Sequence, residues 1–181
     1  MATMQLADTS KLTGKNQELL TQFEKNMGMI PNILKQMANS PATLEGFLLN
    51  RESLSKGLFD GKMAALVGIV IGETYSCEYL LAARVAAGKK AGLTEDEIKL
   101  AKDQTSNDPK VDAGLQFVRN LVLRHAEVAP SDLAELKTVG YTDGEIVELI
   151  AHACQTLFVY YLIQIAEPVL DFPEVPTAFP A

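Results

Sequence analysis

The stretch from Glu73 to Arg84 carries most of the side chains that could do chemistry. A helix over about 76–91 would place Cys77 in its first turn, where the helix dipole favours a thiolate. Arg84 would lie two turns further on the same face, with a cation that could reach back toward the sulfur. The carboxylates of Glu73 and Glu78 oppose ionisation of the thiol. Cys77, Glu73 and Arg84 are therefore the candidate catalytic residues, and the alternative is a small buried thiol beside surface charges.

The second cysteine, Cys154, lies among apolar residues and is predicted to be buried. His152 is two residues away on a different face of the helix, so these side chains form no local cysteine–histidine pair. A contact between Cys154 and Cys77 through the fold stays open, and we expect Cys77 to be the more reactive thiol. Two cysteines are too few for a disulfide framework and fit a reducing compartment.

The sequence predicts neither a metal site nor a cofactor site. It has two histidines, His125 and His152, and they lack the spacing of metal ligands. It contains no glycine-rich phosphate loop and no Gly-x-Ser-x-Gly elbow. His125 follows an arginine near a predicted helix end, where a cation complements the dipole. We therefore expect no metal and no cofactor.

Apolar residues recur at helical spacing along most of the chain, and helix caps separate the segments. Asp60 is predicted to cap a long apolar helix over 62–72. Its small residues Ala64, Gly68 and Gly72 lie four apart and form a smooth ridge that lets another helix approach. Glycine inside a helix costs about 1 kcal/mol relative to alanine, so packing should compensate. Because no segment alternates like a strand, the predicted fold class is all-α.

Two later helices open with similar phrases, Gly92-Leu-Thr-Glu-Asp-Glu-Ile and Gly140-Tyr-Thr-Asp-Gly-Glu-Ile. In each phrase, threonine is the predicted N-cap and the glutamate three residues later closes a capping box. Each glycine ends the preceding helix. The similarity reflects either two good helix starts or a duplicated helical hairpin. Between them, Asp108-Pro109 starts one helix and Ser131 is predicted to cap a short one.

The chain is interpreted as a single helical domain over 15–167, after a flexible segment (1–14) and before an extended tail (168–181). Four of the eight prolines fall in that tail, which excludes a helix there. We expect the tail to pack on the domain or on a neighbouring subunit. The run 149–166 has no formal charge and is interpreted as a buried helix, with a membrane span as the alternative. Together with the tail, this run predicts a homo-oligomer with an apolar interface.

The chain has 181 residues, of which 48% are hydrophobic, and a formal net charge of −7. This hydrophobic content supports a sizeable core and argues against disorder. An acidic balance without a basic cluster argues against a nucleic-acid partner. The first eight residues lack a basic region followed by an apolar run, so no signal peptide is predicted. We expect a cytoplasmic protein without a membrane or nucleic-acid partner.

Five phrases occur in a characteristic order and spacing. They are Met29-Ile-Pro-Asn-Ile-Leu, Asn39-Ser-Pro-Ala-Thr-Leu-Glu-Gly-Phe, Glu73-Thr-Tyr-Ser-Cys-Glu-Tyr, Ala87-Gly-Lys-Lys-Ala-Gly-Leu-Thr-Glu-Asp-Glu-Ile and Asp171-Phe-Pro-Glu-Val. Over about 19–175 the chain thereby resembles the alkyl hydroperoxidase D-like, carboxymuconolactone decarboxylase family, near its peroxidase-related branch. The resemblance implies an all-helical bundle that assembles into dimers, trimers or hexamers, with an active site lined by the cysteine helix.

The redox motif of that family is a glutamate, eleven residues, Cys-x-x-Cys, three residues and a histidine. The resemblance implies that the second cysteine attacks a peroxide, the first closes a disulfide, and the glutamate and histidine relay the proton. In this chain the first cysteine is Cys77. The second cysteine, the histidine and the glutamate are replaced by Leu80, Arg84 and Ala65. Glu73 matches a carboxylate that some members carry just before the cysteines, and it is not the relay residue.

These replacements exclude a two-cysteine peroxidase cycle within the motif, because leucine forms neither a sulfenate nor a disulfide. Arginine stays protonated near neutral pH and cannot shuttle a proton as histidine does. One remaining function is a peroxidase-related, thiol-dependent oxidoreductase with altered activity at Cys77, resolved by Cys154 or by an external thiol. The others are a cofactor-free lyase or isomerase that binds an anionic small molecule through Arg84, and a non-catalytic helical oligomer. The small-molecule substrate is not predicted.

Overall fold

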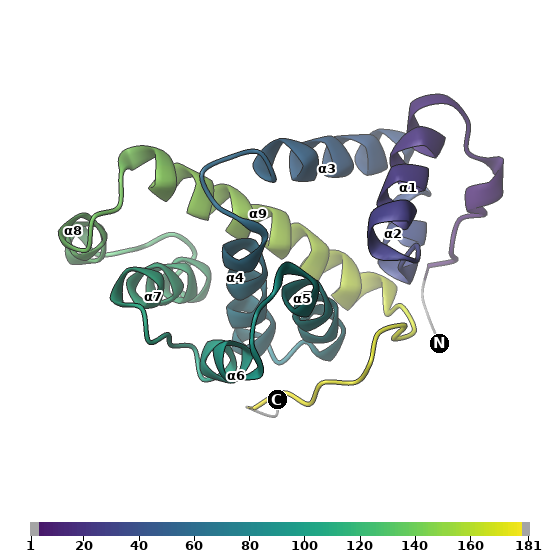
Figure 1. Ribbon diagram of the computed structural model, residues 1–181. Helices are drawn as coiled ribbons and strands as arrows, with labels where there is room; N and C mark the ends of the chain where they lie inside the picture. The colour runs from purple at the N-terminus through teal and green to yellow at the C-terminus, as the bar shows by residue number, and fades with distance from the viewer. Residues whose placement is uncertain (1–3, 179–181) are drawn as a thin grey trace. The chain divides into compact units, whose positions relative to one another are not determined.

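The computed structural model describes residues 4–178, and helices with short connections make up most of that range. The all-α prediction is confirmed, and the described residues contain no strand. A short 3₁₀ turn, η1 (Thr9–Lys11), precedes the first α-helix. The α-helices labelled in Figure 1 are α1 (Gly14–Met27), α2 (Asn32–Met37), α3 (Pro41–Leu54), α4 (Gly61–Thr74), α5 (Glu78–Ala91), α6 (Glu95–Lys102), α7 (Pro109–Leu123), α8 (Pro130–Thr138) and α9 (Asp143–Ala166).

The chain divides into two compact units. The first unit comprises Met1–Ser53 and Tyr161–Asp171, and the second comprises Leu54–Tyr160 and Phe172–Ala181. The boundaries fall at the end of α3 and within α9, so both helices contribute to both units. Every candidate site residue lies in the second unit.

In the first unit, the start of α2 is capped by a residue far along the chain. Asn32, the first residue of α2, donates its backbone N–H to Oδ2 of Asp171 at 2.6 Å. Its side-chain amide donates to the carbonyl of Val169 at 3.0 Å. A carboxylate at a helix N-terminus is favoured by the helix dipole and satisfies a free N–H. The phrase that begins at Met29 and the phrase that begins at Asp171 therefore meet in space.

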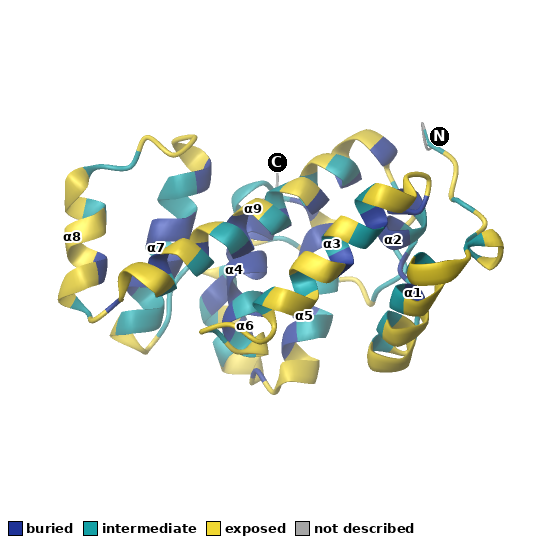
Figure 2. Ribbon diagram, turned by 90° about the horizontal axis from the view of Figure 1, so that it is seen from above, coloured by how far each residue is buried: buried dark blue, intermediate teal, exposed yellow. Residues whose placement is uncertain are grey.

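In the second unit, α4 forms the centre of the core. Every residue from Ala65 to Glu73 is buried, and Figure 2 colours this helix largely dark blue. Helices α5, α6 and α7 pack against it. As predicted, Asp60 caps α4, because its side chain accepts the N–H of Met63 at 2.9 Å. A helix that is apolar on all sides requires such complete burial.

Helices α4 and α5 run antiparallel and in close contact along the predicted ridge of small residues. A Cβ at Gly72 would lie 3.2 Å from the Cα of Leu81, and a Cβ at Gly68 would lie 2.4 Å from Cδ of Arg84. At the far end, a Cβ at Gly61 would lie 3.3 Å from Cβ of Ala91. The missing side chains therefore make room for α5, and this close packing offsets the helix-propensity cost of glycine.

The two predicted capping boxes are confirmed. Thr94 and Thr142 each accept, through Oγ1, the N–H of the glutamate three residues later, at 3.1 Å and 3.2 Å. Each glutamate accepts the threonine N–H in return, at 2.7 Å in both cases. Gly92 ends α5 with a φ of +90°, which is a conformation that glycine adopts freely. Short-range sequence patterns thus predict these helix ends correctly.

The start of α8 differs from its prediction. The helix begins at Pro130, and Ala129 occupies the N-cap position that was predicted for Ser131. The carboxylate of Asp132 accepts the N–H of Ala129 at 2.9 Å. Proline is favoured at the first position of a helix because its φ is already helical and it has no N–H to satisfy. The helix therefore starts before the serine.

The prediction that the run 149–166 is a buried helix is wrong for one face of α9. Its inner face consists of the buried residues Ile146, Leu149, His152, Ala153, Thr156, Val159, Ile163 and Ala166. Its outer face consists of the exposed residues Val147, Ile150, Cys154, Phe158, Tyr161 and Ile165. Among the described helices, α9 is long and apolar enough to cross a membrane. The core helix of a soluble protein can have the same length and composition, so this is weak evidence for a membrane span.

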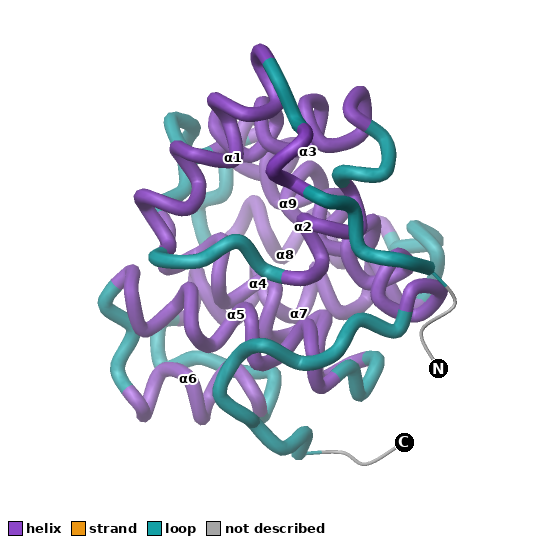
Figure 3. Tube along the Cα trace, turned by 90° about the vertical axis from the view of Figure 1, so that its right-hand side faces the viewer, coloured by secondary structure: helices purple, strands orange, loops and turns teal. Residues whose placement is uncertain are grey.

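The chain is no longer helical after α9, as the prolines predict. Figure 3 shows this tail as a loop that leaves α9 and continues to the C-terminal end of the described chain. From Phe172 onward the tail belongs to the second unit, and its contacts there involve the candidate site.

Candidate active site

The turn between α4 and α5 fixes the backbone of Cys77 on both sides. Cys77 is the N-cap of α5, one position before the predicted first turn. Its N–H donates to the carbonyl of Gly72 at 2.8 Å, and its carbonyl accepts the N–H of Leu81 at 2.9 Å. The preceding residue, Ser76, has a φ of +49°, which residues with a Cβ rarely adopt. The cysteine itself is buried, with 4% of its surface exposed.

Two of the other motif positions lie in the apolar core. Leu80 follows Cys77 in the first turn of α5 and is completely buried. Ala65 is buried in α4, and its Cβ would lie 3.3 Å from a side chain added at Gly88. Core packing therefore fills the sites that would hold the second cysteine and the relay glutamate.

Glu73 is a fully buried carboxylate in the last turn of α4. Its Oε1 lies 3.7 Å from Nζ of Lys102, at the end of α6. Its Oε2 accepts the backbone N–H of Ala178 in the tail at 2.8 Å. A buried carboxylate requires such compensating partners. The structure thus places the predicted residues Glu73 and Cys77 on one turn and adds Lys102 and the tail to them.

Arg84 is directed toward α9 rather than back along α5 to Cys77. Its aliphatic stem crosses α4 at Gly68, where the missing side chain leaves the space that it occupies. Its Nη2 then donates to Oγ1 of Thr156 at 3.2 Å. Arg84 is therefore a half-buried cation held between α4, α5 and α9. Its orientation differs from the predicted one.

Beside Arg84, α9 presents a second polar side chain to the core. His152 lies one turn before Thr156, is 7% exposed, and its Nε2 has no hydrogen-bond partner. The ring of Phe59 packs edge-on against it, with 6.2 Å between the ring centroids. Burial and then the nearby cation of Arg84 lower the pKa of His152, while Glu148 acts in the opposite direction. The neutral imidazole is therefore the stable form in the folded protein.

Cys154 is exposed, so the prediction of a buried second cysteine is wrong. It lies two residues from both His152 and Thr156, which places it about 200° around the helix from each of them. Since those two residues face the core, the thiol of Cys154 faces outward, away from α4 and α5. Its apolar sequence neighbours indicated burial, but they occupy both faces of α9. Cys77 and Cys154 are not joined by a disulfide.

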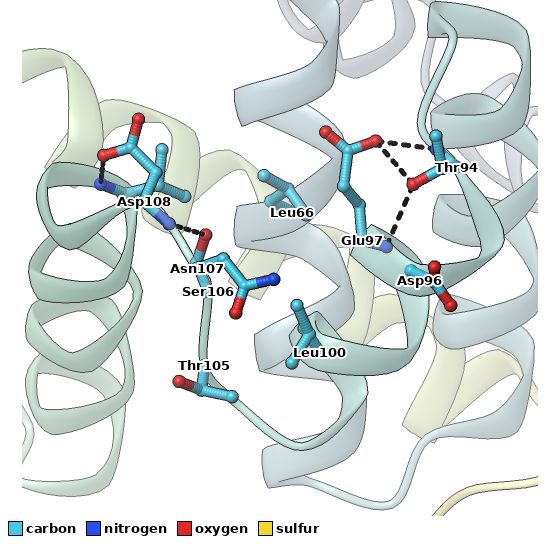
Figure 4. Close-up of a pocket in the computed structure, with 10 residues that line it drawn as sticks. Leu66, Thr94, Asp96, Glu97, Leu100, Thr105, Ser106, Asn107 and Asp108 are labelled. Atoms are coloured by element: carbon cyan, nitrogen blue, oxygen red, sulfur yellow. Dashed lines mark hydrogen bonds between the residues drawn. The ribbon is translucent and has the colours of Figure 1, made fainter.

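A cavity of about 360 Å³ lies elsewhere in the second unit, between α6 and the start of α7 (Figure 4). Its lining residues are Leu66, Thr94, Asp96, Glu97, Leu100, Thr105, Ser106, Asn107, Asp108 and Val111. The carboxylates of Glu97 and Asp108 accept backbone N–H groups at the helix starts that they cap. Hydrogen bonds from Thr94 accordingly lower the pKa of Glu97. These groups stabilise helix ends, and none of the candidate catalytic residues lines the cavity.

Metal ligands are likewise not grouped in the part of the chain that the structure describes. No cluster of three or more histidine, cysteine, aspartate or glutamate side chains in residues 4–178 could hold a metal ion.

The sequence matches no protein-family model and no curated protein. The fold, in contrast, matches solved structures along almost the whole chain. An uncharacterized peroxidase-related protein from Ralstonia eutropha JMP134, described as an alkylhydroperoxidase AhpD core, has a TM-score of 0.81. That match covers 94% of this chain and 92% of the other at 16% identity. The fold is that of the alkylhydroperoxidase AhpD core.

Two further structures share the AhpD-like fold. An uncharacterized peroxidase-related protein from Silicibacter sp. TM1040 has a TM-score of 0.82 at 17% identity, over 93% of this chain and 91% of the other. A cysteine-to-alanine variant of the debrominase Bmp8, in complex with 2,3,4-tribromopyrrole, also has a TM-score of 0.82, at 13% identity over 94% of each chain. The fold that the resemblance implied is confirmed, and activity must be argued from the residues of the site.

Sequence reasoning missed several residues of this site. Lys102 and Ala178 reach Glu73 from distant positions, and the sequence carries no local signal for either contact. Thr156 did carry a signal, because it follows His152 by four residues in an otherwise apolar helix. That spacing places two polar side chains on one helix face.

Proposed function

We propose that the protein is a thiol-dependent, peroxidase-related oxidoreductase in which Cys77 is the reacting thiol. The placement of Cys77 four residues after the buried Glu73, across a turn that contains the strained Ser76, carries the proposal. Backbone strain and buried ionisable groups persist where the surrounding structure compensates for them, and both are common at functional sites. The shared fold of peroxidase-related proteins supports the same class of reaction.

The proposed reaction uses one cysteine. The sulfur of Cys77 attacks the terminal oxygen of an alkyl hydroperoxide, the O–O bond breaks, and Cys77 becomes a sulfenic acid while the peroxide becomes an alcohol. The thiol proton ends on the leaving oxygen, and Glu73 is the proposed carrier. An external thiol then forms a mixed disulfide with Cys77 and releases water. A second external thiol restores Cys77 and leaves as a disulfide.

An external thiol is required because neither internal candidate is suitable. Leu80 occupies the position of the second motif cysteine, and leucine has no redox chemistry. Cys154 faces outward from α9, on the side opposite to His152 and Thr156. We therefore expect turnover to depend on an added thiol and to be slow compared with a two-cysteine enzyme. We also propose a location in a reducing cytoplasm, where external thiols are available, and the proposed reaction needs no metal or bound cofactor.

Turnover of an alkyl hydroperoxide with dithiothreitol as reductant tests the proposal. Cys77→Ser should lower the rate by about 100-fold or to the uncatalysed level, because serine is a much weaker nucleophile. Cys154→Ser is the matched control and should leave the rate unchanged. Equal activity of Cys77→Ser and the unmodified protein would exclude Cys77 as the reacting group. If the unmodified protein shows no turnover, the oxidoreductase proposal is wrong. The lyase or isomerase and the non-catalytic oligomer then remain.

A second candidate function is a cofactor-free lyase or isomerase that acts on an anionic small molecule. The observation that favours it is the placement of the Arg84 cation beside His152, whose Nε2 has no hydrogen-bond partner. A carboxylate between these groups would accept hydrogen bonds from the guanidinium and from the imidazole. In the other neutral tautomer, Nε2 carries the lone pair and would be available as a base instead of as a donor.

Calorimetric titration with adipate and cis,cis-muconate, as carboxylate probes, separates this candidate from the first. Binding that is lost in Arg84→Gln and retained in Arg124→Gln, a control at an exposed arginine, would support it. The absence of binding by the unmodified protein would contradict an anion site at Arg84.

A further inference from the structure

We propose that residues 172–178, here called the C-terminal strap, close the turn that holds Cys77 and must move away to admit a reactant. This inference rests on the proposed function, because it assigns a gate to the same site. The sequence predicted only that this segment is part of an extended tail.

Three contacts hold the strap, and each involves a different helix of the second unit. The ring of Phe172 packs edge-on against Tyr79 of α5, with 5.8 Å between the ring centroids. The carbonyl of Pro176 accepts a hydrogen bond from Nζ of Lys102, in α6, at 2.7 Å. The N–H of Ala178 donates to the carboxylate of Glu73, in α4, at 2.8 Å.

These contacts involve residues that come before and after Cys77 in the sequence. Glu73 precedes the cysteine by four residues and Tyr79 follows it by two, and the strap touches the first through Ala178 and the second through Phe172. Glu73, Cys77 and Tyr79 are all buried. A segment that is fixed at both flanks of a buried thiol is well placed to restrict access to it.

The strap has the properties of a removable cover rather than of a core element. It is extended, and most of its residues are exposed or half-buried. Pro173 and Pro176 have no N–H, so two of the seven strap residues cannot donate a backbone hydrogen bond to the rest of the unit. Segments that make few buried contacts open at a lower free energy than helices of the core.

Closure also affects Glu73 directly. In the closed form, the carboxylate that is the proposed proton carrier accepts the N–H of Ala178 and lies 3.7 Å from Lys102. Opening removes the hydrogen bond from Ala178 to Glu73, which lies four residues before Cys77. The same movement therefore uncovers the thiol and releases the carboxylate from the strap, which couples access to reactivity.

Alkylation of the native full-length protein with N-ethylmaleimide, followed by peptide mapping, tests the strap. Ala178→Pro removes the N–H that Glu73 accepts, and Phe172→Ala removes the ring that packs on Tyr79. Each variant should raise the labelling rate of Cys77 by about tenfold, because a hydrogen bond to a charged group or a buried ring contact changes an opening equilibrium by about that factor. Ala178→Ser keeps the N–H and is the matched control, with no change expected. The exposed Cys154 is an internal standard whose rate should stay constant.

A further control separates opening of the strap from loss of stability. Leu136→Ala weakens the core at α8, away from the strap contacts. It should not raise the labelling rate of Cys77, even when its melting temperature falls as much as that of the strap variants. Equal labelling in Leu136→Ala and the strap variants, or unchanged labelling in both strap variants, would overturn the proposal. Labelling of Cys77 as fast as Cys154 in the unmodified protein would also overturn it. Because alkylation requires no turnover, this result is independent of the peroxide assay, and either proposal can fail alone.

Discussion

At the scale of single residues, the sequence shows which residue occupies each motif position. It does not show whether the side chain there is buried or exposed. The sequence showed that Leu80 replaces the second cysteine, and it placed Cys77 near the start of a helix. Burial of Cys77 and exposure of Cys154 depend on which faces of α5 and α9 meet other helices. A thiol among apolar sequence neighbours has no local feature that distinguishes these environments.

Leu80→Cys tests whether the position three residues after Cys77 can complete a redox pair. We expect the variant to lose two hydrogens on mild oxidation, as a disulfide forms between the two cysteines, and to gain peroxide turnover. The substitution removes buried apolar volume and should lower the free energy of unfolding by about 1–3 kcal/mol. Mass spectrometry and denaturant titration measure these effects, and Leu115→Cys, in the core of α7, is the matched control without a nearby cysteine.

Addition of Arg84→His and Ala65→Glu to Leu80→Cys would restore the full family motif. We expect a further rise in peroxide turnover if the backbone is kept, because histidine and glutamate supply the proton relay. Ala65 is buried next to Gly88, so the new carboxylate is the substitution that most endangers folding. A circular-dichroism melt must accompany the rate measurement, and rapid turnover by the unmodified protein would contradict the interpretation of the motif.

His152 predicts how stability depends on pH. Its pKa in the folded protein lies below the ordinary value of 6.5, because burial and Arg84 disfavour the imidazolium. The unfolded chain therefore binds the extra proton first, so this contribution to stability is complete above about pH 6.5 and is lost as the pH falls below that value. Urea titrations at several pH values should show this loss. His152→Asn should reduce it, while His125→Asn, at an exposed site, should not.

At the scale of elements, the sequence was sufficient to predict several helix ends and one helix-packing surface. The caps at Asp60, Thr94 and Thr142 use short-range hydrogen bonds, which is why the local sequence predicts them. The ridge at Gly68 and Gly72 was predicted to receive a helix, and α5 occupies it. That the stem of an arginine fills the space at Gly68 could not be predicted, because it depends on the register between two helices.

Gly68→Ala tests this register. The added Cβ would lie 2.4 Å from Cδ of Arg84, so the arginine must move away from Thr156. We expect a loss of about 1–3 kcal/mol in the free energy of unfolding, typical of overpacking in a close-packed interior. Gly46→Ala is the matched control, since nothing lies within 4 Å of the added Cβ on α3. It should be neutral or stabilising by up to about 1 kcal/mol, as expected for alanine in an exposed helix. Equal effects at the two positions would contradict the packing at Gly68.

At the scale of the whole molecule, fold class was predictable because regular helical spacing and caps extend along nearly the entire chain. The AhpD-like fold itself is confirmed by structures that share only 13–17% identity. The path of the tail was not predictable, since prolines exclude a helix without specifying the surface on which an extended segment lies. The contacts of Ala178 and Phe172 are the part of the site that only the structure reveals.

The outer face of α9 predicts self-association. Val147, Ile150, Cys154 and Phe158 are exposed and recur every three or four residues, which forms an apolar stripe typical of helix interfaces. We propose a homo-oligomer that buries this stripe. Phe158→Glu should lower the molar mass measured by light scattering at micromolar concentration, because it places a charge in the interface. Leu133→Glu, at an exposed apolar position on α8, is the control. A monomeric unmodified protein would contradict the proposal.

The most direct test of Cys77 as the working thiol is to trap its oxidised form. The native protein is treated with one equivalent of an alkyl hydroperoxide in the presence of dimedone, and the modified peptides are mapped by mass spectrometry. We expect a dimedone adduct on Cys77 in the unmodified protein and in Cys154→Ser, with more adduct when Phe172→Ala opens the strap. An adduct on Cys154 alone, or no adduct on Cys77 in any of these proteins, would contradict the assignment of Cys77 as the reacting residue.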